Sequence, residues 1–138
     1  MAGVTRFSIS IESDLLRRFL KLAKKHGWNN RSEALRNLMR EALVREEWAS
    51  DAEIVGTITI VYDHHKRELT DRLTSIQHDH HHAVLAATHI HLDHDNCLEM
   101  IAVKGPASEV QKIADQLLNT RGVKHGKISA TTTGRKLS

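Results

Sequence analysis

A cluster of side chains that commonly bind metals lies in the carboxy-terminal half of the sequence. It contains His89, His91 and Cys97, with His78 further upstream. Cys97 is the single cysteine of the chain. Sites that are rich in nitrogen and sulfur donors and poor in carboxylates suit nickel, copper or zinc better than calcium or magnesium. The residue types and their spacing therefore predict a site for a late first-row transition metal.

The elements around the cluster can position these donors. Residues 84–92 are apolar and β-branched enough to predict a strand, in which His89 and His91 project from the same face. A tight turn at 94–96 would then place Cys97 at the start of the next strand. A lone cysteine cannot form a disulfide within the chain, so in a reducing compartment it stays available as a ligand.

Composition limits the class of protein. The chain has 138 residues, of which 40% are hydrophobic, and this allows one domain or two small ones. No segment approaches the roughly 20 consecutive apolar residues that span a bilayer. The amino terminus also lacks an apolar signal region, so we expect a cytoplasmic protein without a membrane partner. The net charge of +3 permits nucleic-acid binding without demonstrating it.

The first half predicts a strand followed by two helices. Residues 6–11 alternate between polar and apolar side chains, as a half-buried strand does, and the polar face consists of Arg6, Ser8 and Ser10. So little chain encloses a poor core by itself. We therefore predict an obligate dimer, in which this strand pairs with the same strand of a second chain.

Two helices follow from the helical spacing of apolar residues and from their end signals. Ser13 or Asp14 is expected to cap the first helix, and Gly27 to end it. Asn30 and Glu33 resemble a capping box at the start of the second helix.

The second half predicts the element order βαββαβ, which is that of a ferredoxin-like split βαβ fold. Strands are expected at 54–62, 84–92, 97–103 and 123–132, and helices at 66–79 and 107–119. The predicted fold class is α+β. A small polar linker is expected at 49–53, between an amino-terminal domain at 1–48 and a carboxy-terminal domain at 54–138.

Taken together, several short motifs resemble the nickel-responsive regulator (NikR) family in order and spacing. The matching segments are 6–11, 28–34, 77–78, 89–91, 95–99 and 121–126. The resemblance implies a ribbon-helix-helix (βαα) DNA-binding domain followed by an ACT-like, ferredoxin-like regulatory domain. It also implies a homotetramer, a dimer of dimers in which paired DNA-binding domains flank a metal-binding core.

For the metal, the resemblance implies one Ni(II) per subunit. It assigns His89, His91 and Cys97 of one chain as ligands, with His78 supplied by a neighbouring chain. Four such donors suit square-planar Ni(II), although zinc or copper could also use them. Residues beside a metal site often fix the orientation of its ligands. The candidates for that role are Tyr62, Gln77 and Glu99.

For DNA, the resemblance implies that a ribbon of two strands, one from each chain, enters the major groove. The side chains expected to face the bases are Arg6, Ser8 and Ser10. The start of the second helix, at Asn30, Arg31 and Ser32, offers free N–H groups that can hold a backbone phosphate. The implied partner is a palindromic operator in double-stranded DNA, and the implied outcome is repression of nickel-uptake genes.

Two other functions, catalysis and nickel storage or delivery, fit the sequence less well. A small metal-dependent hydrolase would need an open position for water on its metal, and four strong ligands leave none, so we expect no enzyme. A nickel storage or delivery protein would not need a domain that binds DNA.

The resemblance also bears on a second kind of cation site. Glu33 matches a hard-cation position of the family, whereas Asn37 replaces the usual carboxylate.

The remaining histidines are expected to be solvated, with weak secondary metal binding as the alternative. They are His64, His65, His80, His81, His82 and His94, while His125 is left unassigned.

Overall fold

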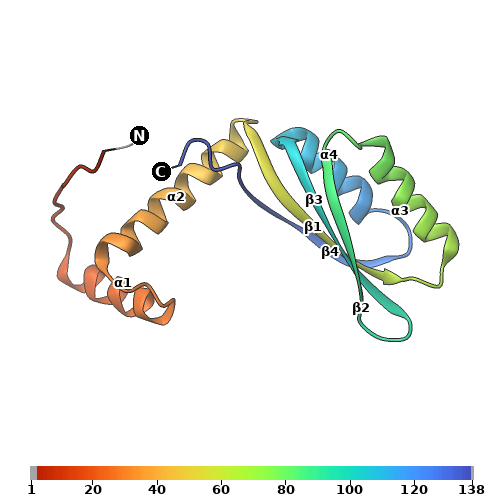
Figure 1. Cartoon of the computed structure of the whole chain (residues 1–138). Helices are drawn as coiled ribbons and strands as arrows, with labels where there is room; N and C mark the ends of the chain where they lie inside the picture. Colours follow the sequence, from red (N-terminus) through yellow and green to blue (C-terminus); the bar gives the residue numbers. More distant parts are fainter. Residues whose placement is uncertain (1–2, 138) are drawn as a thin grey trace. The chain divides into compact units, whose positions relative to one another are not determined.

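A computed structural model describes residues 3–137 of the chain. Within them the elements in chain order are α1 (Ser13–Lys25), α2 (Arg31–Ala49), β1 (Glu53–Asp63), α3 (Arg67–Asp79), β2 (Val84–His91), β3 (Asn96–Pro106), α4 (Ala107–Leu118) and β4 (Val123–Thr132) (Figure 1). They belong to two compact units, whose boundary in the sequence lies within α2, between Leu43 and Val44. Residues 136–137 group with the first unit. No helix within the described range combines the length and apolar content needed to cross a membrane.

In the first unit, α1 ends where the sequence predicts. Gly27 has a φ of 76°, in the left-handed region that favours glycine. Its N–H donates to the Lys24 carbonyl at 3.1 Å, and the N–H of Trp28 donates to the Ala23 carbonyl at 2.9 Å. These two bonds form a Schellman cap, which satisfies carbonyls that the end of the helix would otherwise leave free.

The two helices begin differently. The Asn30 side chain accepts the N–H of Glu33 at 2.7 Å, which is the cap predicted for α2. The prediction that Ser13 or Asp14 caps α1 is wrong. The N-cap position is Glu12, without a side-chain cap bond, and the Asp14 carboxylate pairs with Arg17 one turn later.

The segment before α1 differs from its prediction as a strand at 6–11. In the single chain, residues 3–12 have no regular secondary structure. A strand needs a neighbouring strand to pair with its N–H and C=O groups. Among the described residues of the single chain, this segment pairs with no strand. Its apolar side chains are uncovered as well, since Phe7 is 61% exposed and Ile9 is 62% exposed.

The second unit is a four-stranded antiparallel sheet with the strand order β2-β3-β1-β4. With α3 and α4 it gives the predicted βαββαβ order and an α+β fold (Figure 1). β1 alternates between buried and half-buried positions, so one face of the sheet forms the core with the helices. Its fully buried side chains include Ile58, Ile60, Ile101, Val103, Leu73, Val110, Ile113 and Leu117.

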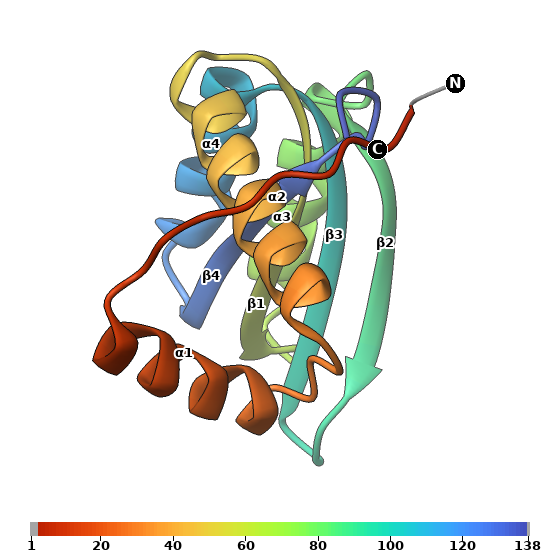
Figure 2. The ribbon, with the colours of Figure 1, turned by 90° about the vertical axis from the view of Figure 1, so that its left-hand side faces the viewer.

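The strand β2 lies at one edge of the sheet, beside β3 (Figure 2). After Val84 every residue of β2 is exposed, on both faces. Leu85 is 58% exposed and Ile90 is 40% exposed. The side chains of this edge strand are therefore open to solvent in the single chain.

The segment that precedes β1 is fastened to the start of α4. The N-cap position of α4 is Pro106, which makes no side-chain cap bond. The Asp51 carboxylate accepts the N–H of Ser108 at 2.6 Å, and the Ala52 carbonyl accepts the N–H of Ala107 at 3.1 Å. Asp51 and Ala52 thus provide from a distance the acceptors that the first turn of a helix needs.

Candidate metal centre

The pairing of β3 with its two neighbours places the backbones of three of the four predicted metal ligands on one face of the sheet. His91 lies opposite Cys97, and His89 lies opposite Glu99. On the other side of β3, Tyr62 of β1 lies opposite Cys97. Directly paired residues of antiparallel strands project from the same face. Because Tyr62, Cys97 and Glu99 are buried in the core, this is the face that the helices cover.

Cys97 and His89 form the centre of the site. The Cys97 Sγ lies 4.0 Å from Nδ1 of His89. Cys97 is only 2% exposed, whereas the His89 side chain is 52% exposed. Two ligands at about 2.0 to 2.3 Å from a metal ion lie roughly 3 to 3.7 Å apart. A small closing movement would therefore let both atoms bind one ion, whose outer side would face solvent.

The buried carboxylate of Glu99 contacts His89, the exposed member of this pair. The Tyr62 hydroxyl donates to Oε1 of Glu99 at 2.9 Å, and the Gln77 amide donates to Oε2 at 2.9 Å. Nε2 of His89 lies 3.4 Å from Oε2 of the same carboxylate. Tyr62 of β1 and Gln77 of α3, two of the residues predicted to orient ligands, therefore meet at Glu99 of β3, and Tyr62 and Glu99 contact His89.

Tyr62 keeps its proton in this environment. Burial raises the pKa of Tyr62 well above its usual range, and the hydrogen bond to the Glu99 carboxylate raises it further. The hydroxyl oxygen also lies 3.4 Å from Nδ1 of His89. Tyr62 is thus a fixed hydrogen-bond donor beside the candidate ligands.

The other two predicted ligands lie apart from Cys97 and His89. The His91 ring packs edge-on against His64, with 4.8 Å between ring centroids. His78 is exposed in the last turn of α3, where its ring centroid lies 6.1 Å from that of His81. Adjacent residues on a helix do not share a face, so His78 projects from a different side of α3 than Gln77, which reaches Glu99.

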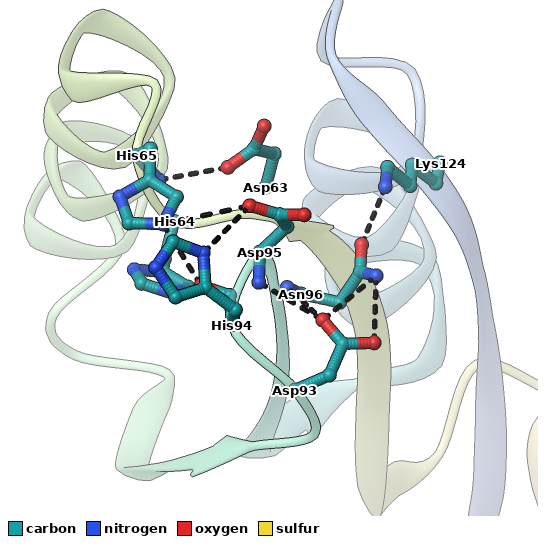
Figure 3. A network of polar contacts seen from close by, with 8 residues as sticks. All are labelled: Asp63, His64, His65, Asp93, His94, Asp95, Asn96 and Lys124. Atoms are coloured by element: carbon teal, nitrogen blue, oxygen red, sulfur yellow. Dashed lines mark hydrogen bonds and ion pairs between the residues drawn. The ribbon is translucent and has the colours of Figure 1, made fainter.

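A second group of donors lies nearby and was not predicted as a site. Among residues 3–137, the one group of three or more potential metal donors whose ligand atoms all lie within 4.8 Å of one another is His65, His94 and Asp95 (Figure 3). From the sequence, His65 and His94 are expected to be solvated, with weak secondary metal binding as the alternative. Only the register of β1 with β3, in which Asp63 pairs with Asn96, brings the two turns together.

The residues predicted to contact DNA are accessible in the first unit. Arg6, Ser8 and Ser10 are exposed, as are Arg31 and Ser32. All except Ser10 line one groove between the segment 3–9 and the first turns of α2. Asn30 is exposed too, and its side chain is engaged in the helix cap. The groove thus combines cationic and hydroxyl side chains with apolar ones.

The predicted hard-cation position is engaged by a neighbour. The Glu33 carboxylate accepts a hydrogen bond from Arg36 at 2.8 Å. This hydrogen bond and the Arg36 charge lower the pKa of Glu33 below its usual value. A cation at Glu33 would have to compete with Arg36.

Comparison with known proteins gives matches along nearly the whole chain. The family model "Ribbon-helix-helix protein, copG family" matches residues 5–46, and the model "NikR C terminal nickel binding domain" matches residues 55–131. Proteins named "Putative nickel-responsive regulator" are 51% identical over 138 residues in Solibacter usitatus and 53% identical over 138 residues in Geobacter sulfurreducens, in both cases with 99% of each chain covered. A third, from Nitratidesulfovibrio vulgaris strain Miyazaki F, is 51% identical over 139 aligned positions, with 100% of each chain covered.

Proposed function

This chain belongs to the family of nickel-responsive regulators, and from that premise we propose that it binds operator DNA under the control of nickel. The amino-terminal unit, which matches the ribbon-helix-helix family, would contact DNA. The carboxy-terminal unit, which matches the nickel-binding family, would hold the ion. The observation that carries the proposal is the pair of Cys97 and His89, set 4.0 Å apart in front of the buried Glu99.

The donor set fits nickel. His89, His91 and Cys97 of one chain, with His78 of another, would supply three imidazoles and a thiolate to one Ni(II) per subunit. Such a set suits square-planar nickel. Two features of the single chain support the division between chains. His78 is exposed, and the edge strand β2, which carries His89 and His91, is open to an incoming side chain.

Completion of the site requires a movement of His91. Its ring now contacts His64, although its backbone lies directly opposite Cys97. Rotation of the side chain away from His64 would direct it toward the thiol. Tyr62, Gln77 and Glu99 would meanwhile hold His89 in place, as residues around a metal commonly do for its ligands.

In a tetramer, metal binding would depend on how the subunits are arranged. A site whose ligands come from two chains is complete in one arrangement of those chains only. Nickel would favour DNA binding to the extent that it binds better to the arrangement that presents both ribbons to the two halves of a palindromic operator. Repression of nickel-uptake genes in the cytoplasm is the proposed outcome.

The DNA contact would need a second chain as well. The exposed apolar side chains of Phe7 and Ile9 would be covered when two segments pair as a ribbon. Arg6, Ser8 and Ser10 would then face the bases on the other side of the ribbon, and Arg6 could donate twice to guanine. The backbone N–H groups at the start of α2 would position the ribbon on a phosphate.

Two alternative functions remain as test outcomes. Membership in a regulator family favours binding over catalysis, and the four-donor set leaves no position for a reactive water. A storage or delivery protein would take up nickel without any effect on DNA binding. The measurement below separates this function from regulation.

The test is fluorescence anisotropy of the full-length protein on DNA from upstream of the nickel-uptake genes of its own genome. Binding is measured with metal chelated and with stoichiometric Ni(II). We expect tight, sequence-selective binding with nickel only. Equal binding in both states, or none in either, would contradict a nickel-controlled regulator of these genes.

Two variants assign the roles of the units. Arg6→Ala should abolish selective DNA binding and leave nickel uptake intact, whereas Cys97→Ala should remove the nickel response. Arg45→Ala, which changes another exposed arginine, is the matched control for Arg6. Normal operator binding by Arg6→Ala, or a retained response in Cys97→Ala, would show the corresponding assignment to be wrong.

A further inference from the structure

We propose that His65, His94 and Asp95 form a second site for a divalent transition metal ion, distinct from the site at Cys97. The ion would bind at the end of the sheet, between the turn that follows β1 and the turn that joins β2 to β3. Its ligands would be two imidazoles and one carboxylate, all from the same chain. The proposal rests on the convergence of these donors and does not depend on the function proposed above.

The sheet register brings the two turns together. Asp63, the last residue of β1, pairs with Asn96, the first residue of β3. Immediately beyond this pair, the N–H of His64 donates to the Asp95 carbonyl at 3.2 Å. Each turn therefore continues from a paired strand end, and their side chains meet in one place (Figure 3).

Side-chain hydrogen bonds shape both turns before any ion binds. Asp63 accepts the N–H of His65 at 2.9 Å. Asp93 accepts the N–H groups of Asp95 and Asn96 at 2.9 and 2.8 Å. The Asn96 side chain contacts Asp93 and Lys124 (Figure 3). A binder whose backbone is already ordered pays less for ordering when its ligand arrives.

The donor atoms are close to the separations that a bound ion needs. Oδ1 of Asp95 lies 3.1 Å from Nδ1 of His94 and 3.7 Å from Nε2 of His65. Ligands at about 2.0 to 2.2 Å from a metal ion lie roughly 3 to 3.6 Å apart. The third pair, between the ring nitrogens of His65 and His94, lies within 4.8 Å, and all three side chains are exposed and able to move closer around an ion.

A bound ion would compete with the His94 carbonyl oxygen for the imidazole of His65. Its oxygen lies 2.8 Å from Nε2 of His65 and 2.8 Å from Nε2 of His64. A neutral imidazole reaches a carbonyl by donating its N–H. Metal binding at Nε2 of His65 would therefore break this hydrogen bond and require the other tautomer, with the proton on Nδ1. The His64 ring lies 4.1 Å from the His65 ring, between centroids, and could join as a fourth donor.

The chemistry of this donor set defines the class of ion. Imidazoles with a carboxylate and no thiolate suit zinc, nickel, cobalt or copper in its divalent state. All three residues are exposed, so water can occupy the remaining coordination positions. Without a thiolate and without burial, this site should fill after the site at Cys97.

The other histidine cluster shows the contrast. His80 and His82 also lie near each other in sequence, but their ring centroids are 6.3 Å apart. Nε2 of His80 lies 2.8 Å from Gln116, and His82 pairs with Glu109. Because these side chains have separate partners, they provide a control that changes the same number of histidines.

The test is equilibrium dialysis of untagged full-length protein against Ni(II), with bound metal counted as free metal is raised. Absorption from thiolate-to-nickel charge transfer reports the Cys97 site separately. We expect wild type to bind one equivalent with this absorption and a further equivalent without it. His65→Gln/His94→Gln should lose only the further equivalent, while His80→Gln/His82→Gln should retain both.

Two more variants keep the result interpretable. Cys97→Ser should lose the thiolate absorption and retain the further equivalent, so failure of the first site cannot be mistaken for failure of the second. Asp95→Asn should weaken the further equivalent without removing either histidine. Unchanged binding in His65→Gln/His94→Gln, or no equivalent beyond the first in wild type, would overturn the proposal.

Discussion

Asp51 caps α4 across the fold, because its carboxylate accepts the N–H of Ser108 at 2.6 Å although the two residues are 57 positions apart. Asp51 has a φ of 61°, which asparagine and glycine adopt more readily than alanine. We expect Asp51→Asn to melt close to wild type, Asp51→Gly to melt lower because it lacks the cap, and Asp51→Ala to melt lowest because it also strains the backbone. Thermal unfolding of the three variants tests this order, and a higher melting temperature for Asp51→Ala than for Asp51→Gly would contradict it.

The same contact predicts a dependence of stability on pH. The Ser108 N–H lowers the pKa of Asp51 below its ordinary value of 3.8. A carboxyl whose folded pKa is depressed stabilises the fold fully above its unfolded pKa, and this contribution is lost as the pH falls through the folded value. The difference in melting temperature between wild type and Asp51→Gly should therefore be largest near neutral pH and shrink below about pH 4. A constant difference would show that the charge of Asp51 is not involved.

Glu99 should matter for both folding and nickel affinity. Glu99→Ala would leave the Tyr62 hydroxyl and the Gln77 amide without their common acceptor. An unsatisfied buried polar group costs about 1 to 3 kcal/mol, so the free energy of unfolding of the metal-free protein should fall by at least that much in a denaturant titration. Gln77→Ala, which removes one donor and leaves the carboxylate, should cost less.

For nickel, the expected effect of Glu99→Gln is a loss of affinity with the fold retained. Residues that orient metal ligands typically contribute 10- to 100-fold in affinity, because they hold the ligand in its binding orientation. Competition for Ni(II) against a chelator of known affinity measures the change. Equal affinity in Glu99→Gln and wild type would show that the contact of Glu99 with His89 has no role in binding.

Gly126 is predicted to be irreplaceable in β4. A Cβ at this position would clash with Cδ2 of Leu118 and would lie 2.7 Å from the Thr59 carbonyl oxygen. The Leu118 side chain can move, but the backbone of β1 cannot move without disturbing the sheet. Overpacking of this kind typically costs about 1 to 3 kcal/mol, which chemical denaturation of Gly126→Ala would detect. Gly3→Ala is the matched control, because a Cβ there meets nothing within 4 Å.

The uncovered side chain of Ile9 gives a prediction about assembly. If two segments pair as a ribbon, Ile9→Asp would bury a charge against apolar neighbours and weaken the pairing. Sedimentation velocity should then show a smaller assembly than that of wild type at the same concentration. Ser10→Asp changes a residue on the opposite face and should leave the assembly unchanged. The same sedimentation coefficient for Ile9→Asp and wild type would contradict pairing through this face.

Periodic patterns in the sequence predicted most of the fold. The alternation in 54–62 and the helical spacing in 107–119 correspond to β1 and α4, because burial of one face imposes a period on the sequence. The Asn30 cap was predictable since its partner is three residues away. The cap at Ser13 or Asp14 was predicted wrongly, because α1 already begins at Ser13 and Glu12 occupies the N-cap position.

Contacts between turns could not be predicted in the same way. Two such contacts connect polar residues that are far apart in sequence: Asp51 with Ser108, and His65 with Asp95. Such residues carry no periodic signal, and only the strand register places them together. The pairing of His91 with Cys97 lies between these cases, since the short turn between β2 and β3 makes it plausible while the side-chain rotation of His91 depends on His64.

The unequal exposure of His89 and Cys97 has a consequence for how the site would fill. An ion that arrives from solvent would meet the open imidazole first and the shielded thiol last. The sulfur of Cys97 would therefore bind from the buried side of the site. The same shielding should slow attack on the sulfur by peroxide, since oxidation requires an accessible thiolate. In the metal-free protein, burial would thus protect Cys97 from oxidation.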